Sequence, residues 1–131
     1  MTKIAILCVD DEVVILDSLK RQLKRHFGPQ YIYEVAENVA DAWEVITDLN
    51  DEGVNVLVVV SDWLMPGVKG DEFLIQVHQQ FPNVIKILLT GQADETAIRR
   101  VKEQANLHRY LDKPWQEDDL INAITTGLEN L

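Results

Sequence analysis

Residues 54–70 read VNVLVVVSDWLMPGVKG, and this stretch decides which fold the chain adopts. The run 54–60 is largely apolar on both of the alternating faces that a strand presents, so it needs cover on both sides. Central strands of parallel sheets receive that cover from helices packed on each face. The run leads to Asp62, a carboxylate that a protein interior does not hold unpaired. We therefore expect Asp62 to lie where a central strand reaches the edge of its sheet.

Strand-like and helix-like patterns alternate on both sides of this stretch. Short apolar runs predict further strands at 4–9, 31–36, 84–90 and 108–111. After each strand, apolar residues recur at three- and four-residue spacing, which predicts five helices. Five strand–helix pairs in strict alternation predict one α/β domain over 1–131, with a parallel sheet between two helical layers. The helical stripes are Ile15 or Leu16, Leu19, Leu23 and Phe27; Val39, Ala42, Ile46 and Leu49; Phe73 or Leu74, Val77 and Phe81; Ala97, Ile98, Val101 and Ala105; and Leu120, Ile121, Ile124 and Leu128.

The composition is that of a single acidic domain. The 131 residues are 47% hydrophobic, which suffices for one core of ordinary size. The net charge of -10 disfavours direct binding to nucleic acid or to anionic membranes. The lone Cys8 lies in an apolar run, where we expect a buried, inert thiol. No apolar run approaches the ~18 residues of a membrane span and no signal-peptide pattern opens the chain, so we predict a soluble, cytoplasmic protein.

Polar residues follow the predicted strands at the point where each strand ends. They are Asp10 and Asp11, Asp62, Thr90 and Lys113. Because ligands of such sheets bind outside the carboxyl ends of the strands, we expect these side chains to lie close together. Three clustered carboxylates repel one another unless a cation lies among them, and oxygen ligands without histidine or thiol favour Mg²⁺. An ionised aspartate is also a competent nucleophile for phosphoryl transfer, with Lys113 and Thr90 placed to contact the phosphoryl oxygens.

Each of these residues has a simpler explanation when taken alone. Asp10 and Asp11 are suited to cap the following helix, and Asp62 to form a turn before the Pro-Gly pair that follows it. Thr90 is typical of a turn with Gly91. Two other functional classes fit poorly, because a dinucleotide-binding domain needs a glycine-rich turn after the first strand. A phosphatase of the haloacid-dehalogenase type places a second aspartate two residues after its nucleophile, where this chain has Leu64.

Four motifs resemble those of a known family. VDDE at 9–12, SDWLMPGVKG at 61–70, LLTG at 88–91 and YLDKP at 110–114 are similar, at the same spacing, to the receiver domain of bacterial two-component response regulators. The resemblance covers the whole chain. It implies a flavodoxin-like (βα)5 fold, a three-layer sandwich with strand order 2-1-3-4-5. It also implies a phosphorylation-dependent switch, which catalyses only its own phosphotransfer and slow autodephosphorylation.

The resemblance implies roles for the acidic residues. Asp62 would accept a phosphoryl group from a phosphohistidine of a sensor histidine kinase or phosphotransfer protein, in a Mg²⁺-dependent reaction. Asp11 and Asp62 would bind the magnesium ion directly, together with the backbone carbonyl of Leu64. Asp10 would reach the ion through water. The alternative is a receiver-like interaction module that is never phosphorylated, and the complete set of acidic and basic residues argues against it.

The resemblance also implies a switch. Thr90 and Lys113 would contact the phosphoryl group, and Tyr110 matches the switch aromatic of the family. The bond between Lys113 and Pro114 is a candidate cis peptide. The fourth helix has a thin, alanine-rich stripe, so we expect it to move most easily. The face of fourth helix, fifth strand and fifth helix would then control a fused output domain, a partner or a second copy of the chain.

Two further groups of residues are of interest. Leu64 and Gln92, two residues beyond Asp62 and Thr90, occupy positions at which the family varies and tunes hydrolysis of the acyl phosphate. A basic cluster on the predicted fourth helix contains Arg99, Arg100 and Lys102. A solvated helix face is the first interpretation of this cluster, and pairing with an acidic partner or a second copy is the other.

Overall fold

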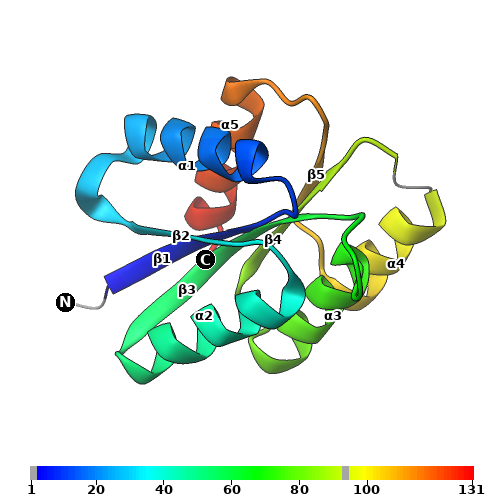
Figure 1. Ribbon diagram of the computed structural model, residues 1–131, viewed down its shortest axis with the longest axis horizontal. Helices are drawn as coiled ribbons and strands as arrows, with labels where there is room; N and C mark the ends of the chain where they lie inside the picture. Colours follow the sequence, from blue (N-terminus) through cyan, green and yellow to red (C-terminus); the bar gives the residue numbers. More distant parts are fainter. Residues whose placement is uncertain (1–2, 93–94) are drawn as a thin grey trace.

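The computed structural model describes residues 3–92 and 95–131 and contains a five-stranded sheet between two layers of helices (Figure 1). The strand order is β2-β1-β3-β4-β5, and every neighbouring pair is parallel. The predicted flavodoxin-like architecture is therefore confirmed, with β3 at the centre. The strands are β1 (Lys3–Val9), β2 (Ile32–Ala36), β3 (Val54–Asp62), β4 (Ile85–Thr90) and β5 (Arg109–Asp112).

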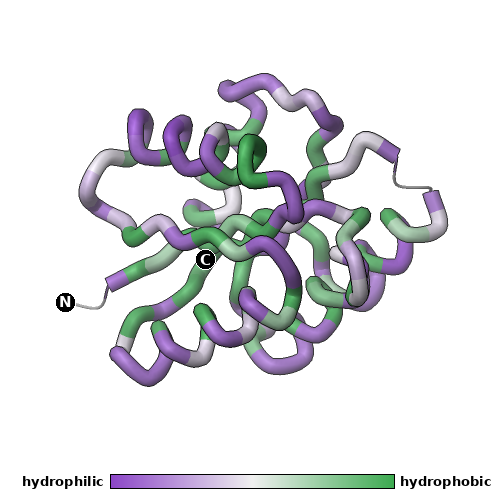
Figure 2. Tube along the Cα trace, in the orientation of Figure 1, coloured by the Kyte–Doolittle hydropathy of each residue, from purple (hydrophilic) through white to green (hydrophobic). Residues whose placement is uncertain are grey.

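The helices cover the sheet on both faces, as the apolar run of β3 requires. Val58 and Val60 of β3 belong to the core under α1 and α5, whereas Val59 belongs to the core under α2, α3 and α4. Figure 2 shows the hydrophobic strands between helices whose outer surfaces are hydrophilic. Within the described residues, no helix has the length and apolar character needed to cross a membrane. The helices are α1 (Val13–Phe27), α2 (Val39–Asp51), α3 (Gly70–Gln80), α4 (Glu95–Ala105) and α5 (Glu117–Glu129), with a short 3-10 turn η1 (Gly28–Gln30) after α1.

The ends of several elements differ from the predicted ones. The strand β3 extends two residues beyond the predicted run, because Ser61 and Asp62 continue the pairing with β4. The strand β5 begins one residue later and ends at Asp112, which pairs with Thr90. The helix α3 ends at Gln80, so the prediction that Phe81 is helical was wrong. Pro82 follows Phe81, and the residue before a proline is disfavoured in helical conformation.

Cys8 is buried, as its apolar run predicts, and a glycine follows the end of α1. Burial, followed by the charge of Asp10, raises the pKa of the Cys8 thiol to about 12, so the thiol stays protonated and unreactive. The helix α1 ends at Phe27 and is followed by Gly28, which has a positive φ of 64°, and by Pro29 in the 3-10 turn η1. Glycine reaches this conformation without the steric cost that a side chain adds.

Candidate functional site

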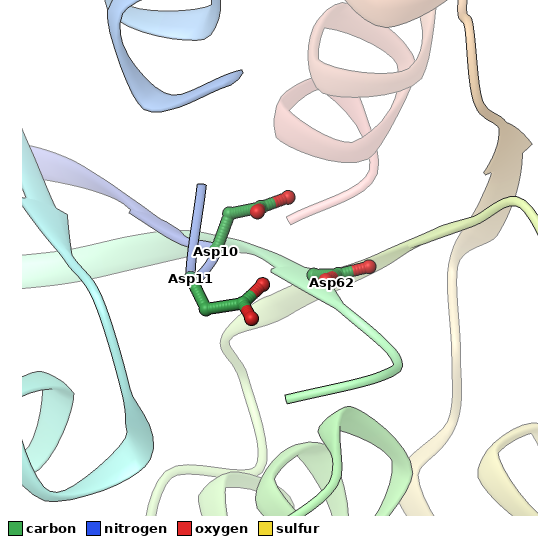
Figure 3. A group of neighbouring side chains, drawn as sticks. All are labelled: Asp10, Asp11 and Asp62. Atoms are coloured by element: carbon green, nitrogen blue, oxygen red, sulfur yellow. The ribbon is translucent and has the colours of Figure 1, made fainter. Parts of the chain in front are cut away.

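Three carboxylates lie together at the carboxyl edge of the sheet. Asp10 and Asp11 follow β1 and Asp62 ends β3, and Figure 3 shows their side chains extending into the same region. One carboxylate oxygen from each residue lies within 4.8 Å of the others. Asp10 is 0% exposed and Asp62 is 6% exposed, whereas Asp11 is open to solvent. The predicted acidic cluster is thus present, with two members buried and one at its mouth.

Asp10 is held in place by backbone groups. Its carboxylate oxygen Oδ1 accepts a hydrogen bond from the backbone N–H of Glu12 at 2.9 Å. Its own N–H donates to the carbonyl of Ala36 at 3.1 Å. Asp10 is therefore not the cap of α1, because the N-cap residue is Glu12, but its Oδ1 binds the N–H of that residue. The other oxygen points to Lys113, so a single residue orders the start of α1 and also takes part in the cluster.

Lys113 brings a positive charge to the carboxylates. Its Nζ lies 2.6 Å from Asp10 Oδ2 and 3.2 Å from Asp62 Oδ1. The peptide bond between Lys113 and Pro114 is cis, as the family resemblance implies. The backbone N–H of Lys113 donates to the carbonyl of Thr90 at 3.0 Å, which joins the end of β5 to the end of β4. The ammonium group offsets only part of the charge of three carboxylates.

The electrostatics of the cluster favour an additional cation. Burial, followed by the charge of Asp10, raises the pKa of Asp62, although Lys113 and the backbone N–H of Trp63 act in the opposite direction. Burial acts to lower the pKa of Lys113, but the hydrogen bond and charge of Asp10, and then Asp62, raise it on balance. The ammonium of Lys113 is therefore stabilised by its carboxylate neighbours, whereas the charge of Asp62 is only partly compensated. In the described part of the chain, no histidine or cysteine joins the cluster. A donor set of carboxylate oxygens fits Mg²⁺ better than a softer metal.

Thr90 and several other predicted site residues line a cavity at the carboxylate cluster, whereas Asp10 does not reach its lining. The cavity has a volume of about 220 Å³. Thr90 is buried at the end of β4, and its hydroxyl accepts a hydrogen bond from the N–H of Gln92 at 3.0 Å. Leu64 is exposed at the rim. The lining consists of Asp11, Glu12, Asp62, Trp63, Leu64, Thr90, Gly91, Gln92 and Lys113. Asp62, Thr90 and Lys113 are thus brought together, as the strand-end rule predicts.

Tyr110 lies away from this cavity. It pairs with Leu88 in the sheet, and its side chain is 40% exposed on the outer side of β5. The Nζ of Lys102 from α4 lies 5.7 Å from the centre of its ring. The predicted switch aromatic is therefore in an outward position next to α4.

Sequence patterns do not indicate two features next to the cluster. One is Gly70, the first residue of α3, whose N–H donates to the carbonyl of Trp63 at 2.7 Å. A β-carbon on Gly70 would lie 1.9 Å from the carbonyl oxygen of Asp62, so only glycine fits there. The other is an ion pair of Arg100 with Asp71 and Glu72, which joins α4 to α3. A glycine that begins a helix directly after a turn is the one signal that points to the first feature.

Comparisons with known proteins agree with the motifs and the fold. The family model of the response regulator receiver domain matches residues 6–125. Over 124 residues, the chain is 32% identical to the hydrogenase transcriptional regulatory protein HoxA of Cupriavidus necator, covering 95% of this chain and 24% of that protein. The chain therefore spans about a quarter of the length of such curated relatives.

Solved structures of receiver domains superpose closely on the chain. The signal receiver domain of an HD domain-containing protein from Pseudomonas fluorescens Pf-5 is 30% identical, with a TM-score of 0.86 over 98% of this chain and 96% of that one. A CheY-like receiver domain protein from Methanospirillum hungatei JF-1 is 29% identical, with a TM-score of 0.84 over 99% of this chain and 96% of that one. The chain belongs to the response regulator receiver domain family of two-component systems.

Proposed function

We propose that Asp62 accepts a phosphoryl group from a phosphohistidine of a sensor histidine kinase or phosphotransfer protein. The observation that carries this proposal is the position of Asp62 in the cavity, beside two further carboxylates and 3.2 Å from the ammonium of Lys113. An anion that enters this cavity meets Lys113 and the hydroxyl of Thr90. The charge of the carboxylates themselves requires a cation before a phosphoryl group approaches.

The proposed reaction transfers the phosphoryl group between two side chains. One carboxylate oxygen of Asp62 forms a bond to phosphorus, while the bond from phosphorus to the donor imidazole nitrogen breaks and its electron pair stays on that nitrogen. Lys113 and Thr90 orient the group and stabilise the charge on its equatorial oxygens. Mg²⁺, held by Asp11, Asp62 and the carbonyl of Leu64, with Asp10 through water, would supply the remaining neutralisation of charge.

The proposed switch begins with the added charge. A phosphoryl group brings roughly -1.5 to -2 charges and several acceptors. The Thr90 hydroxyl turns towards these acceptors, and Tyr110 moves inward from its exposed position into the space that Thr90 leaves. The contact between Tyr110 and Lys102 ties this motion to α4. The face of α4, β5 and α5 thus differs between the two states and controls an output domain, a partner or a second copy.

We infer that the chain works in the cytoplasm as one receiver unit over residues 1–131. It acts as a switch whose only catalysis is its own phosphotransfer and slow autodephosphorylation. The relatives named above support an output domain, since one is a transcriptional regulatory protein and another a receiver beside an HD domain. The net charge of -10 makes direct contact of this domain with nucleic acid or anionic membranes unfavourable.

The test of this function is the intact mass after incubation with phosphoramidate and Mg²⁺. Wild type should gain one phosphoryl group that alkali removes, and Asp62→Asn should gain none. Asp112→Asn, which removes an exposed carboxylate of β5, is the matched control and should label like wild type. Equal labelling of wild type and Asp62→Asn would contradict the assignment of Asp62. Absence of labelling in wild type would favour the interaction module that is never phosphorylated.

A further inference from the structure

A single arginine joins α4 to the start of α3. Arg100 Nη1 lies 3.1 Å from Asp71 Oδ2, and Nη2 donates to Glu72 Oε2. The guanidinium is therefore shared between two acids and does not form a two-bond pair with either. Asp71 is buried, and its second oxygen, Oδ1, is buried without a hydrogen-bond partner in the described part of the chain. The pair thus includes a buried carboxylate that depends on Arg100 for its stabilisation.

The start of α3 is fixed to the end of β3, the strand that contains Asp62. Gly70 donates its N–H to the carbonyl of Trp63 at 2.7 Å and lies against the carbonyl of Asp62 without room for a side chain. Asp71 and Glu72 follow Gly70 directly in the chain. The two acids that bind Arg100 are therefore mounted on a segment that touches the backbone of Asp62. Arg100 therefore connects α4, through the start of α3, to the backbone next to Asp62.

The helix α4 has few other strong attachments. Its buried side chains are Ala97, Val101 and Ala105, which are small and bury little apolar area. Among the described residues, the ion pairs of Arg100 are the only salt bridges that α4 makes with another element. Exposed ion pairs contribute little, but removing one partner of a buried carboxylate is costly. Arg100 therefore has a large share in holding α4 where it lies.

The structure shows the ion pair in the unphosphorylated arrangement of Tyr110 and Thr90. Tyr110 is exposed, and the hydroxyl of Thr90 accepts a hydrogen bond from its own loop. Under the proposed switch, both side chains move when Asp62 is phosphorylated, and α4 moves with them. A contact that exists in only one of two arrangements biases the equilibrium towards that arrangement.

We propose that Arg100 is a positioning residue that holds α4 in the unphosphorylated arrangement by pairing with Asp71 and Glu72, and thereby weakens phosphoryl binding at Asp62. This proposal rests on the proposed function of Asp62. By linkage, a ligand that favours the other arrangement must overcome the free energy of this pair. Loss of the pair raises the fraction of molecules that are ready to bind, and the apparent affinity rises with that fraction. If Arg100 had a merely structural role, its removal would weaken ligand binding at Asp62.

The test measures binding of beryllofluoride, a non-covalent mimic of a phosphoryl group, in the presence of Mg²⁺ by calorimetry. Arg100→Ala should bind about five- to tenfold more tightly than wild type, a factor at the lower end of typical allosteric couplings. Arg99→Ala is the matched control, because Arg99 is the exposed neighbour on the same helix and makes no salt bridge among the described residues. Its affinity should equal that of wild type. The affinity of Arg100→Lys should lie between those of Arg100→Ala and wild type. Lysine keeps the positive charge but lacks the two guanidinium nitrogens that bind Asp71 and Glu72 separately.

A second measurement needs no ligand. Backbone amides of α4 should exchange hydrogen faster in Arg100→Ala than in Arg99→Ala, because α4 then keeps only its small buried side chains and the contact of Lys102 with Tyr110. Glu72→Gln, which weakens the pair from the α3 side, should raise both the exchange and the affinity, and it replaces Arg100→Ala if that variant does not fold. Equal or weaker beryllofluoride binding by the folded Arg100 and Glu72 variants would overturn the proposal.

The two proposals fail in different ways. If wild type does not bind beryllofluoride, the function proposed for Asp62 is contradicted, and the exchange experiment still tests the attachment of α4. Equal exchange in Arg100→Ala and Arg99→Ala would show that the ion pair does not hold α4, whatever happens at Asp62.

Discussion

Asp62 combines reactivity with a cost to the folded state. The proposed chemistry needs an ionised carboxylate, yet the residue is buried beside the second buried carboxylate of Asp10. Burial and the charge of Asp10 raise its pKa above the ordinary value of 3.8. The charged form is therefore less stable in the folded protein than in the unfolded chain. A cation bound among the carboxylates would offset this cost.

The first prediction at the residue scale is that Asp62→Asn stabilises the protein. The amide carries no charge and keeps an oxygen that accepts from Lys113. A raised pKa in the folded state means that the penalty is complete above the folded pKa and disappears below the unfolded value of 3.8. At pH 7, we expect the free energy of unfolding to rise relative to wild type, and the gain should shrink as the pH falls towards 4.

Urea unfolding of both proteins between pH 7 and pH 4, without divalent cations, measures this difference. Asp11→Asn is a suitable control, because Asp11 belongs to the same cluster but is exposed to solvent. A gain that is independent of pH, or a loss of stability at pH 7, would contradict the electrostatic explanation.

The second prediction concerns Gly70. A methyl group there would lie 1.9 Å from the carbonyl oxygen of Asp62, and neither backbone segment yields without moving α3 or the end of β3. We expect Gly70→Ala to reduce the free energy of unfolding by about 3 kcal/mol, at the upper end of overpacking effects. Gly91→Ala is the control, because its added carbon would make only ordinary contacts, at 3.8 Å from the β-carbon of Lys113. Similar midpoints of thermal unfolding for the two variants would show that the close approach is not strained.

At the scale of elements, the largely apolar strand β4 contains a buried lysine, Lys86. Lys86 is 1% exposed, and its Nζ donates to the carbonyls of Val84 at 2.5 Å and Pro82 at 3.4 Å. No carboxylate of the described residues forms a salt bridge with it. Burial lowers the pKa of Lys86 to about 8. The strand therefore holds an ammonium group that is costly at neutral pH.

This burial predicts a pH dependence of stability. The folded pKa of about 8 lies below the unfolded value of 10.5, so the unfolded chain binds more protons between these values. The contribution of Lys86 to stability therefore rises with pH over this interval. Relative to wild type, Lys86→Met should be most favoured at pH 7, and its advantage should fall by about 1–3 kcal/mol as the pH rises from 8 to 10.5.

Comparison of the two proteins removes the effect of other groups that titrate in this range, such as Cys8. Lys24→Met, at an exposed position of α1, should show no such trend relative to wild type. A constant difference between Lys86→Met and wild type across the interval would mean that Lys86 is not shifted.

At the scale of the whole molecule, the parallel topology brings residues that are far apart in the sequence to one edge of the sheet. Asp62 and Thr90 end β3 and β4, Asp10 and Lys113 follow β1 and β5, and parallel strands bring these carboxyl ends to one edge of the sheet. The fold and the membership of the cluster were therefore predictable from the order of apolar runs and the residues after them. The apolar residues on both faces of β3 likewise predicted a central strand.

Other features depend on how elements meet in space. The pairing of Arg100 with Asp71 and Glu72 joins two helices, and a local pattern assigned Arg100 only to a basic cluster. The need for glycine at position 70 depends on the path of the loop after Asp62. Phe81 fits a helical stripe, but Pro82 ends the helix before it. Side-chain pairing across elements and the exact ends of elements are set by tertiary contacts that periodicity does not encode.

The central position of β3 also bears on when the site comes into existence during folding. Asp10 and Asp62 lie at the two ends of a segment that contains α1, β2 and α2, and β1 pairs with β3 across this whole crossover. Neither hairpins nor single helices assemble the carboxylate cluster, because parallel neighbours form only after long loops close. An intact cluster is therefore a mark of a completed chain topology. Ligands that need all of its members bind the native protein alone and protect it from unfolding by mass action.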